Sequence, residues 1–150
     1  MIIFAIDPGT DKSAFVLYGT ADGGGIIDKG ILPNEEMREK ILETKADVYA
    51  CEMIECYGMA VGRSVFVTLL WIGRFVELMR GDMELIPRRS AKMFLCNSMK
   101  AKDANIRQAL IDRLGEQGTK KKQGGTYGVK SHIWSALAIA VTAQNLQEMK

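Results

Sequence analysis

The sequence predicts an α/β fold, in which a mixed five-stranded sheet is flanked by helices. Short apolar segments rich in β-branched residues fill the first third of the chain, and longer segments with helical periodicity dominate the remainder. A further strand-like segment separates the first two helical segments. The 150 residues suit a single domain, residues 1–150, because domains most often contain about 100 to 150 residues.

Three consecutive strands open the chain, over residues 1–6, 14–18 and 25–31. The first ends in the turn Asp-Pro-Gly-Thr at residues 7–10, and Ala-Asp-Gly-Gly at residues 21–24 favours a hairpin turn. Short turns of this kind connect antiparallel neighbours, so we expect these three strands to pair antiparallel.

A helix, a strand and the longest helix follow. Asn34 precedes two glutamates and is the predicted N-cap of a helix that ends near Thr44. Residues 47–52 form a short buried strand that, like the first, ends at a carboxylate. Residues 59–80 form a helix that is apolar on most of its sides, so it must bury more than one face.

The last third is mainly helical. Residues 83–86 predict a fifth strand, residues 90–96 a short helix, and residues 102–114 an amphipathic helix. Residues 115–129 contain five glycines and three consecutive lysines, which indicates a flexible loop. Ser131 is the predicted cap of a final helix.

The charge is distributed unevenly. The formal net charge is only +2, yet residues 1–87 contain 8 Lys or Arg against 14 Asp or Glu, whereas residues 88–130 contain 11 against 3. A basic segment beside an acidic half suits a polyanionic partner together with a carboxylate metal site. A solvated basic surface would also explain it.

Cysteine usage and hydropathy exclude several classes of protein. Cys51, Cys56 and Cys96 have no CxxC spacing, and there is one histidine, which argues against a structural zinc site or a disulfide framework. The longest nearly apolar segment, residues 65–72, is far shorter than the roughly 20 residues of a bilayer span. We therefore expect no membrane segment and no signal peptide, and a cytoplasmic location.

Two carboxylates end two of the predicted strands. Asp7 follows the first strand, where α/β sheets gather ligands, although an aspartate before Pro-Gly also initiates turns. Glu52 shares one strand face with Val48 and Ala50, so a cation must compensate its charge unless it points into water. His132, at the start of the final helix, is a third candidate, although such histidines are usually surface residues.

Four segments together resemble a known family. They are Phe-Ala-Ile-Asp-Pro-Gly-Thr (residues 4–10), Cys-Glu (51–52), Lys-Asp-Ala-Asn-Ile-Arg-Gln (102–108) and His-Ile-Trp-Ser-Ala-Leu-Ala-Ile-Ala (132–140). In order and spacing they are similar to the RuvC family of Holliday-junction resolvases, and especially to the short RuvC-like endonucleases of phages and prophages. The resemblance covers nearly the whole chain. It implies an RNase H-like fold, a homodimer, and metal-dependent cleavage of branched DNA.

The resemblance also implies site residues. Asp7 matches the first metal-binding aspartate, Glu52 the central glutamate, and His132 the first member of the final acidic pair. Ser135 stands where bacterial members have their last aspartate, and a hydroxyl is a poor replacement for a carboxylate. Asp103 or Glu55 could compensate, and Asp103 is preferred because its helix begins in the family's active-site region.

The implied chemistry is hydrolysis of a phosphodiester by two divalent cations about 4 Å apart. Asp7, Glu52 and His132 would hold the ions, Mg²⁺ or Mn²⁺, and Asp103 would complete the catalytic set. The imidazole at position 132 is a softer ligand than a carboxylate, which favours Mn²⁺.

Basic residues of the second half predict the DNA contacts. The glycine-rich loop would let Tyr127 approach an opened strand. The candidates are Lys100, Lys102, Arg107, Lys120, Lys121, Lys122 and Tyr127.

The long helix is the predicted dimer interface. Phe66 and Leu70 would anchor it, and Gly73 would permit close approach. Burial inside a monomeric core is the competing interpretation.

Two other functions remain to be weighed. Ser135 and His132 also fit a branched-DNA-binding protein with weakened or absent catalysis. Asp-Pro-Gly-Thr occurs in ATP sites of the actin-like and sugar-kinase kind, but that fold needs two domains around the nucleotide, and 150 residues are too few.

Overall fold

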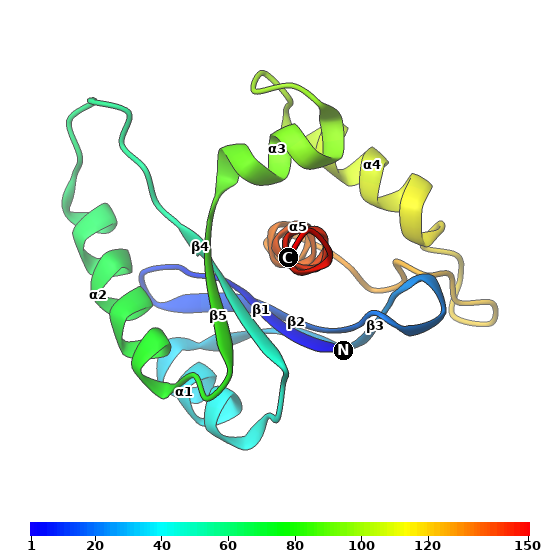
Figure 1. Cartoon of the computed structure of the whole chain (residues 1–150), viewed down its shortest axis with the longest axis horizontal. Coiled ribbons are helices and arrows are strands. Elements are labelled where there is room, and N and C mark those ends of the chain that lie inside the picture. The colour runs from blue at the N-terminus through cyan, green and yellow to red at the C-terminus, as the bar shows by residue number, and fades with distance from the viewer.

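The computed structural model describes all 150 residues and contains a five-stranded mixed sheet with helices on both faces (Figure 1). The strand order is β3-β2-β1-β4-β5. The strands are β1 (Ile2–Asp7), β2 (Lys12–Gly19), β3 (Gly25–Pro33), β4 (Val48–Met53) and β5 (Asp82–Pro87). The helices are α1 (Asn34–Glu43), α2 (Arg63–Leu78), α3 (Arg88–Cys96), α4 (Asp103–Leu114) and α5 (Ile133–Glu148), with a 3₁₀ turn, η1 (Ala21–Gly23).

The topology confirms the predicted mixed sheet. β1, β2 and β3 pair antiparallel, whereas β4 is parallel to both β1 and β5. The carboxyl ends of β1, β4 and β5 therefore lie at one edge of the sheet, the edge at which α/β folds position ligands. Asp7 at the end of β1 and Glu52 near the end of β4 therefore both lie at that edge.

Alternate residues of β1 face two different cores. Ile3 and Ala5 pack toward α5, whereas Phe4 and Ile6 pack toward α1 and α2. Burial on both faces explains why this central strand is an almost continuous apolar run. It also fixes the direction of Asp7, which continues the row of Ile3 and Ala5 and so points to the α5 side.

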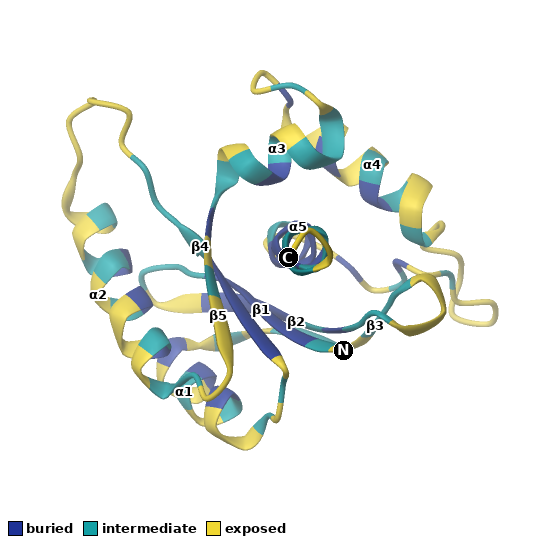
Figure 2. Ribbon diagram, in the orientation of Figure 1, coloured by how far each residue is buried: buried dark blue, intermediate teal, exposed yellow.

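The helix α5 is the centre of the larger core. It is buried almost continuously from Ile133 to Ala143, and Figure 2 shows it enclosed between the sheet on one side and α3 and α4 on the other. Small alanines let the helix lie close to β1 and β2, while Leu137 and Ile139 fill the remaining space. Each fully buried side chain of that size contributes roughly 1.5–3 kcal/mol to folding. No helix of the protein is long and apolar enough to cross a membrane.

The predicted start of the long helix was wrong. Residues 59–62 are not helical, and α2 begins at Arg63. Tyr57 and Gly58 both adopt positive φ, which turns the chain sharply after β4, and Gly62 is extended at the N-cap position. Apolar composition continued through this turn, so hydropathy alone placed the start too early.

Two predicted helix caps were also wrong. Pro33 occupies the N-cap position of α1, because the Asn34 side chain is used elsewhere: its Nδ2 donates to the Gly9 carbonyl (2.9 Å) and its Oδ1 accepts from Ser13 Oγ (2.6 Å). These bonds fix the turn that follows β1. Ser131 lies in the left-handed region (φ 50°) and makes no cap, and His132 takes the N-cap position of α5.

The predicted loop is present, and part of it forms a hydrogen-bonded hairpin. We call residues 117–124 the lysine hairpin. The Gly124 N–H donates to the Gln117 carbonyl and the Thr119 N–H to the Lys122 carbonyl, both at 3.0 Å. A Cβ on Gly124 would lie 1.8 Å from the Glu116 carbonyl oxygen, so only glycine permits this close approach.

Candidate active site

The register of β1 and β4 places Asp7 beside Glu52. Ile6 is the parallel partner of Cys51, so the next residue of each strand is a carboxylate at the same level. Both continue a sheet row that faces α5, because Ala5 and Ala50 belong to the α5 core. Two acidic side chains from segments 45 residues apart in sequence therefore meet at one sheet edge.

His132 completes this group from the first turn of α5. Its Nδ1 lies 2.9 Å from Asp7 Oδ2. Asp7 is buried, at 6% exposed, whereas the imidazole is open to solvent on its outer side. The N-terminus of α5 also directs its positive dipole end toward this corner, which favours negative charge there.

Burial of the two carboxyl groups shifts their protonation. Desolvation raises the pKa of Asp7 above its ordinary value, and the neighbouring His132 opposes the rise. Desolvation, followed by repulsion from Asp7, raises the pKa of Glu52 to about 7, with Arg88 opposing. Desolvation therefore disfavours the ionised form of both carboxyl groups, and a bound cation would offset that cost.

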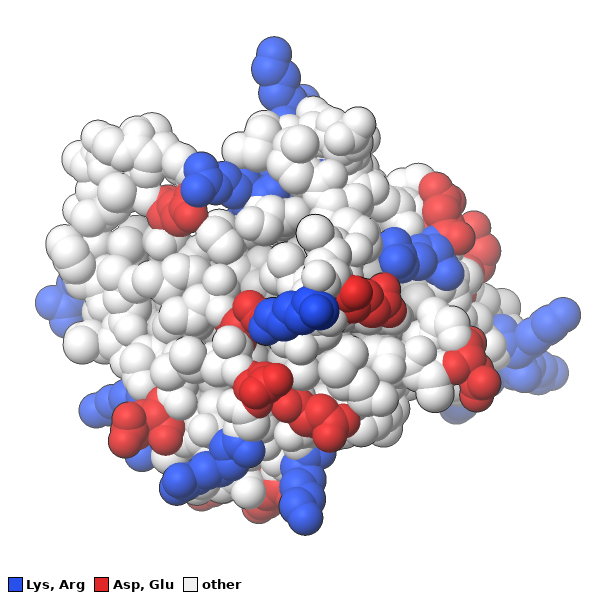
Figure 3. Space-filling view, in the orientation of Figure 1, with Lys and Arg blue, Asp and Glu red and all other residues white.

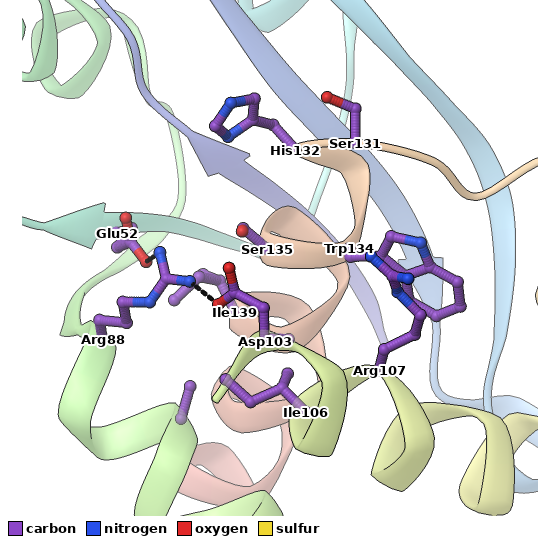
Figure 4. Close-up of a pocket in the computed structure, with 12 residues that line it drawn as sticks. Glu52, Arg88, Asp103, Ile106, Arg107, Ser131, His132, Trp134, Ser135 and Ile139 are labelled. Atoms are coloured by element: carbon purple, nitrogen blue, oxygen red, sulfur yellow. Dashed lines mark hydrogen bonds and ion pairs between the residues drawn. The ribbon is translucent and has the colours of Figure 1, made fainter. Parts of the chain in front are cut away.

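An open cavity of about 260 Å³ adjoins these residues (Figure 4). Glu52 reaches it from β4, His132 and Ser135 from α5, Arg88 from α3 and Asp103 from α4. Four elements thus contribute polar side chains to one concave site. The predicted catalytic residues Asp7, Glu52, His132 and Asp103 are brought together at this corner of the fold.

Arg88 is the residue that sequence reasoning did not single out. Its Nη1 lies 4.0 Å from Glu52 Oε1, and its Nη2 pairs with Asp103 Oδ1. The available signal was its position directly after the predicted fifth strand, whose carboxyl end lies at the same sheet edge in the structure. Of the two acids considered as substitutes at Ser135, Asp103 lines the cavity, whereas Glu55 pairs with Arg89 at 3.3 Å.

The donor set fits a hard divalent cation, although its side chains are not closed around one. No three His, Cys, Asp or Glu side chains converge closely enough to form a metal site in this structure. Asp7 and Glu52 nevertheless supply carboxylate oxygens, the ligands that Mg²⁺ and Mn²⁺ prefer. Glu52 Oε1 also lies 4.0 Å from the Arg88 guanidinium.

The predicted DNA-binding residues form two groups. Arg107 lines the cavity and its guanidinium stacks on Trp134 at 5.4 Å, while Lys100 and Lys102 are exposed on the segment that precedes α4. The three lysines of the lysine hairpin form the second group, and Figure 3 shows basic side chains projecting at that edge. Tyr127 is half-buried at the hairpin's base, so it is less accessible than the sequence suggested.

A pH-dependent stability difference should accompany the Glu52 shift. Because its pKa rises from 4.5 to about 7, folded protein keeps a proton that unfolded protein loses between these values, so stability falls as pH rises through this window. Glu52→Gln removes this titrating group, so the variant should not lose stability over this pH range. We expect the variant to exceed wild type by about 2 to 3 kcal/mol at pH 8, and to match it near pH 4. Urea unfolding at both pH values measures this, and equal stabilities at pH 8 would contradict the shift.

Comparison of the structure with solved structures establishes the fold. The RuvC structure of Thermus thermophilus is similar with a TM-score of 0.74 and 16% identity, over 99% of this chain and 96% of that chain. The same enzyme in complex with a Holliday junction substrate gives a TM-score of 0.74 and 15% identity, with the same coverage. A fowlpox virus resolvase complexed with Holliday junction DNA is a weak match, with a TM-score of 0.48 and 11% identity over 96% of this chain and 99% of that chain.

The chain has the RNase H-like fold of the RuvC type, as predicted. At these identities the likeness concerns the fold and not the activity. No protein-family model and no curated protein matches the sequence.

Proposed function

We propose that this protein is a divalent-metal-dependent endonuclease that cleaves branched DNA, with four-way junctions as its first substrate class. One observation carries the proposal: Asp7, which is buried, and Glu52, which is half-buried, end two adjacent parallel strands side by side, with His132 in contact with Asp7. The RuvC-type fold supports it, because one similar structure holds a Holliday junction substrate.

The residues of the site have separable tasks in this proposal. Asp7 and Glu52, with His132, would hold Mg²⁺ or Mn²⁺, and the ion would supply the activation of water and the neutralisation of charge on the phosphate. His132 also fixes the orientation of the Asp7 carboxylate through its 2.9 Å contact. In the reaction a water oxygen bonds to phosphorus and the P–O3′ bond breaks, which leaves a 5′-phosphate and a 3′-hydroxyl.

DNA would be held by the two basic groups. Arg107 lines the cavity, and Lys100 and Lys102 are exposed just before α4, so we expect these three to bind the phosphates of the strand being cut. The lysine hairpin presents its three lysines on a hydrogen-bonded backbone, from which they can bind the phosphates of a second duplex arm. The free cysteines suit a reducing compartment, and we place the reaction in the cytoplasm.

A homodimer would use the outer face of α2. The inner face, with Thr68, Ile72 and Phe75, is buried against the sheet, so the helix is not enclosed within a monomeric core. On its outer face Phe66 is 57% exposed and Leu70 70% exposed. Large apolar side chains in an exposed row mark a protein interface, and a twofold dimer would set two active sites across a junction.

Replacing Leu70 by aspartate should convert the dimer to a monomer. The substitution places a charge in the centre of the proposed apolar interface, where it would lack a partner. We expect a monomer at micromolar concentration in sedimentation velocity, with an unchanged thermal midpoint for the monomer fold. Leu42→Asp is the matched control, because Leu42 is 58% exposed on α1 and lies outside this face. If the wild-type protein sediments as a monomer, the proposed dimer interface is wrong.

A structure-specific DNA-binding protein without catalysis is the second candidate. Ser135 in the cavity and the ion pair between Arg88 and Asp103 favour it, because both reduce the carboxylates available to metal. The two candidates differ in one assay: labelled four-way junctions, flaps and forks incubated with Mg²⁺, Mn²⁺ or EDTA. We expect nicks with either metal and none with EDTA, whereas tight binding without nicks would establish the second candidate.

A further inference from the structure

Arg88 occupies the space between two acids of the active site. It is the first residue of α3, directly after β5, and its side chain is 42% exposed, so it could extend into solvent. Instead Figure 4 shows the guanidinium directed between Glu52 and Asp103. It contacts Glu52 at 4.0 Å and forms an ion pair with Asp103. A fixed positive charge therefore already lies within the carboxylate cluster.

The balance of charge around the cavity limits the number of divalent cations that the site can bind. When ionised, Asp7, Glu52 and Asp103 supply three negative charges, and Arg88 supplies one positive charge. One divalent cation together with Arg88 balances these charges. Two divalent cations together with Arg88 would exceed them by two positive charges in a partly buried site, where uncompensated charge is unfavourable.

The chain also lacks a ligand for a second ion. Ser135 lines the cavity one helical turn from His132, and a neutral hydroxyl contributes no charge there. Asp103 is the only further acid in the cavity lining besides Glu52, and its carboxylate is already paired with Arg88. Arg88 therefore neutralises part of the carboxylate charge on the side of the site where Glu52 and Asp103 lie.

We propose that the site binds one divalent cation and that Arg88 replaces the second, as a catalytic residue that contacts the scissile phosphate. The proposal rests on the proposed function and deepens it. A guanidinium has five N–H donors, so Arg88 can keep its ion pair with Asp103 and still donate a hydrogen bond to a phosphate oxygen. As the P–O3′ bond breaks, its electron pair moves onto the 3′ oxygen, and Arg88 stabilises that charge until the oxygen takes a proton from solvent.

The test pairs metal binding with cleavage in the full-length protein. Mn²⁺ binding is measured by isothermal titration calorimetry, and junction nicking is measured at saturating Mg²⁺. Wild type should bind one Mn²⁺ per chain. Arg88→Ala should still bind one, several-fold more tightly because a repelling charge is gone, yet nick about 100-fold more slowly or worse. Arg88→Lys should restore part of the rate, because it restores the charge.

A neighbouring arginine provides the matched control. Arg89 follows on the same helix and pairs with Glu55 at 3.3 Å, so it contacts none of the four predicted catalytic residues. Arg89→Ala should therefore leave both Mn²⁺ affinity and nicking rate at the wild-type level. A thermal melt of each variant checks that the fold is retained.

Several results would overturn the inference while leaving the nuclease intact. They are two Mn²⁺ ions per wild-type chain, full or faster nicking by Arg88→Ala, or loss of Mn²⁺ binding together with nicking in that variant. The last would mean that Arg88 only supports the metal ligands. A wild-type protein that nicks no junction with any metal would contradict both the inference and the proposed function.

Discussion

Asp7→Asn should reduce junction nicking at least 10³-fold while leaving the protein folded and able to bind DNA. Asp7 is the buried member of the carboxylate pair and the partner of His132, so the substitution removes one metal-binding oxygen and one negative charge. Loss of several kcal/mol of transition-state stabilisation corresponds to about this change in rate. Single-turnover nicking with Mg²⁺, alongside electrophoretic binding, measures the two effects separately.

The stability of this variant provides a second criterion. Because the pKa of Asp7 is raised by burial, its ionised form is disfavoured in the folded protein, and asparagine should not lower the thermal midpoint at pH 8. Asp82→Asn is the control, because Asp82 is exposed and begins β5, at the end of that strand that lies away from the active-site edge. A folded Asp7→Asn protein that nicks at the wild-type rate would contradict the assignment of the site.

Removing the three lysines of the lysine hairpin should weaken DNA binding about 100-fold at 0.1 M salt. Each lysine that neutralises a phosphate releases a counterion, so the slope of log K against log salt should become about 2.7 units less steep. The hairpin's backbone bonds do not depend on these side chains, and the fold should be unaffected. Fluorescence anisotropy with a labelled junction, over a salt series, measures both quantities.

The control for the hairpin is a second triple-alanine variant with the same charge change. Lys45 and Arg80 precede β4 and β5, and Lys150 ends the chain beyond α5, so all three are exposed and away from the cavity. Their removal should change the salt slope by much less than one unit. Equal slopes for the two variants would show that the hairpin does not contact phosphates.

Much of this architecture could be predicted because it depends on local patterns. The apolar runs that end at Asp7 and Glu52 identified the two central strands, and parallel pairing then brought their carboxylates together. His132 entered through the resemblance of four segments, and its contact with Asp7 shows that two of these segments meet in space. Short-range sequence signals were sufficient wherever a side chain's direction follows from strand alternation.

Other features depended on contacts between distant segments. The direction of Arg88 follows from how α3 and α4 pack around α5, which no local pattern encodes. The conformation of the lysine hairpin depends on the close approach of Gly124 to the Glu116 carbonyl, a contact that the glycine-rich sequence alone does not predict. Asn34 was misassigned as a cap because its partners, Gly9 and Ser13, belong to a turn more than 20 residues earlier.

Diffraction from crystals soaked in Mn²⁺, recorded for its anomalous signal, tests the metal site most directly. The account predicts a peak in contact with the carboxylates of both Asp7 and Glu52, beside the His132 imidazole, and no such peak in Asp7→Asn crystals. If saturating Mn²⁺ leaves this corner without a peak while the same protein still nicks junctions, the cleavage chemistry belongs to another part of the molecule.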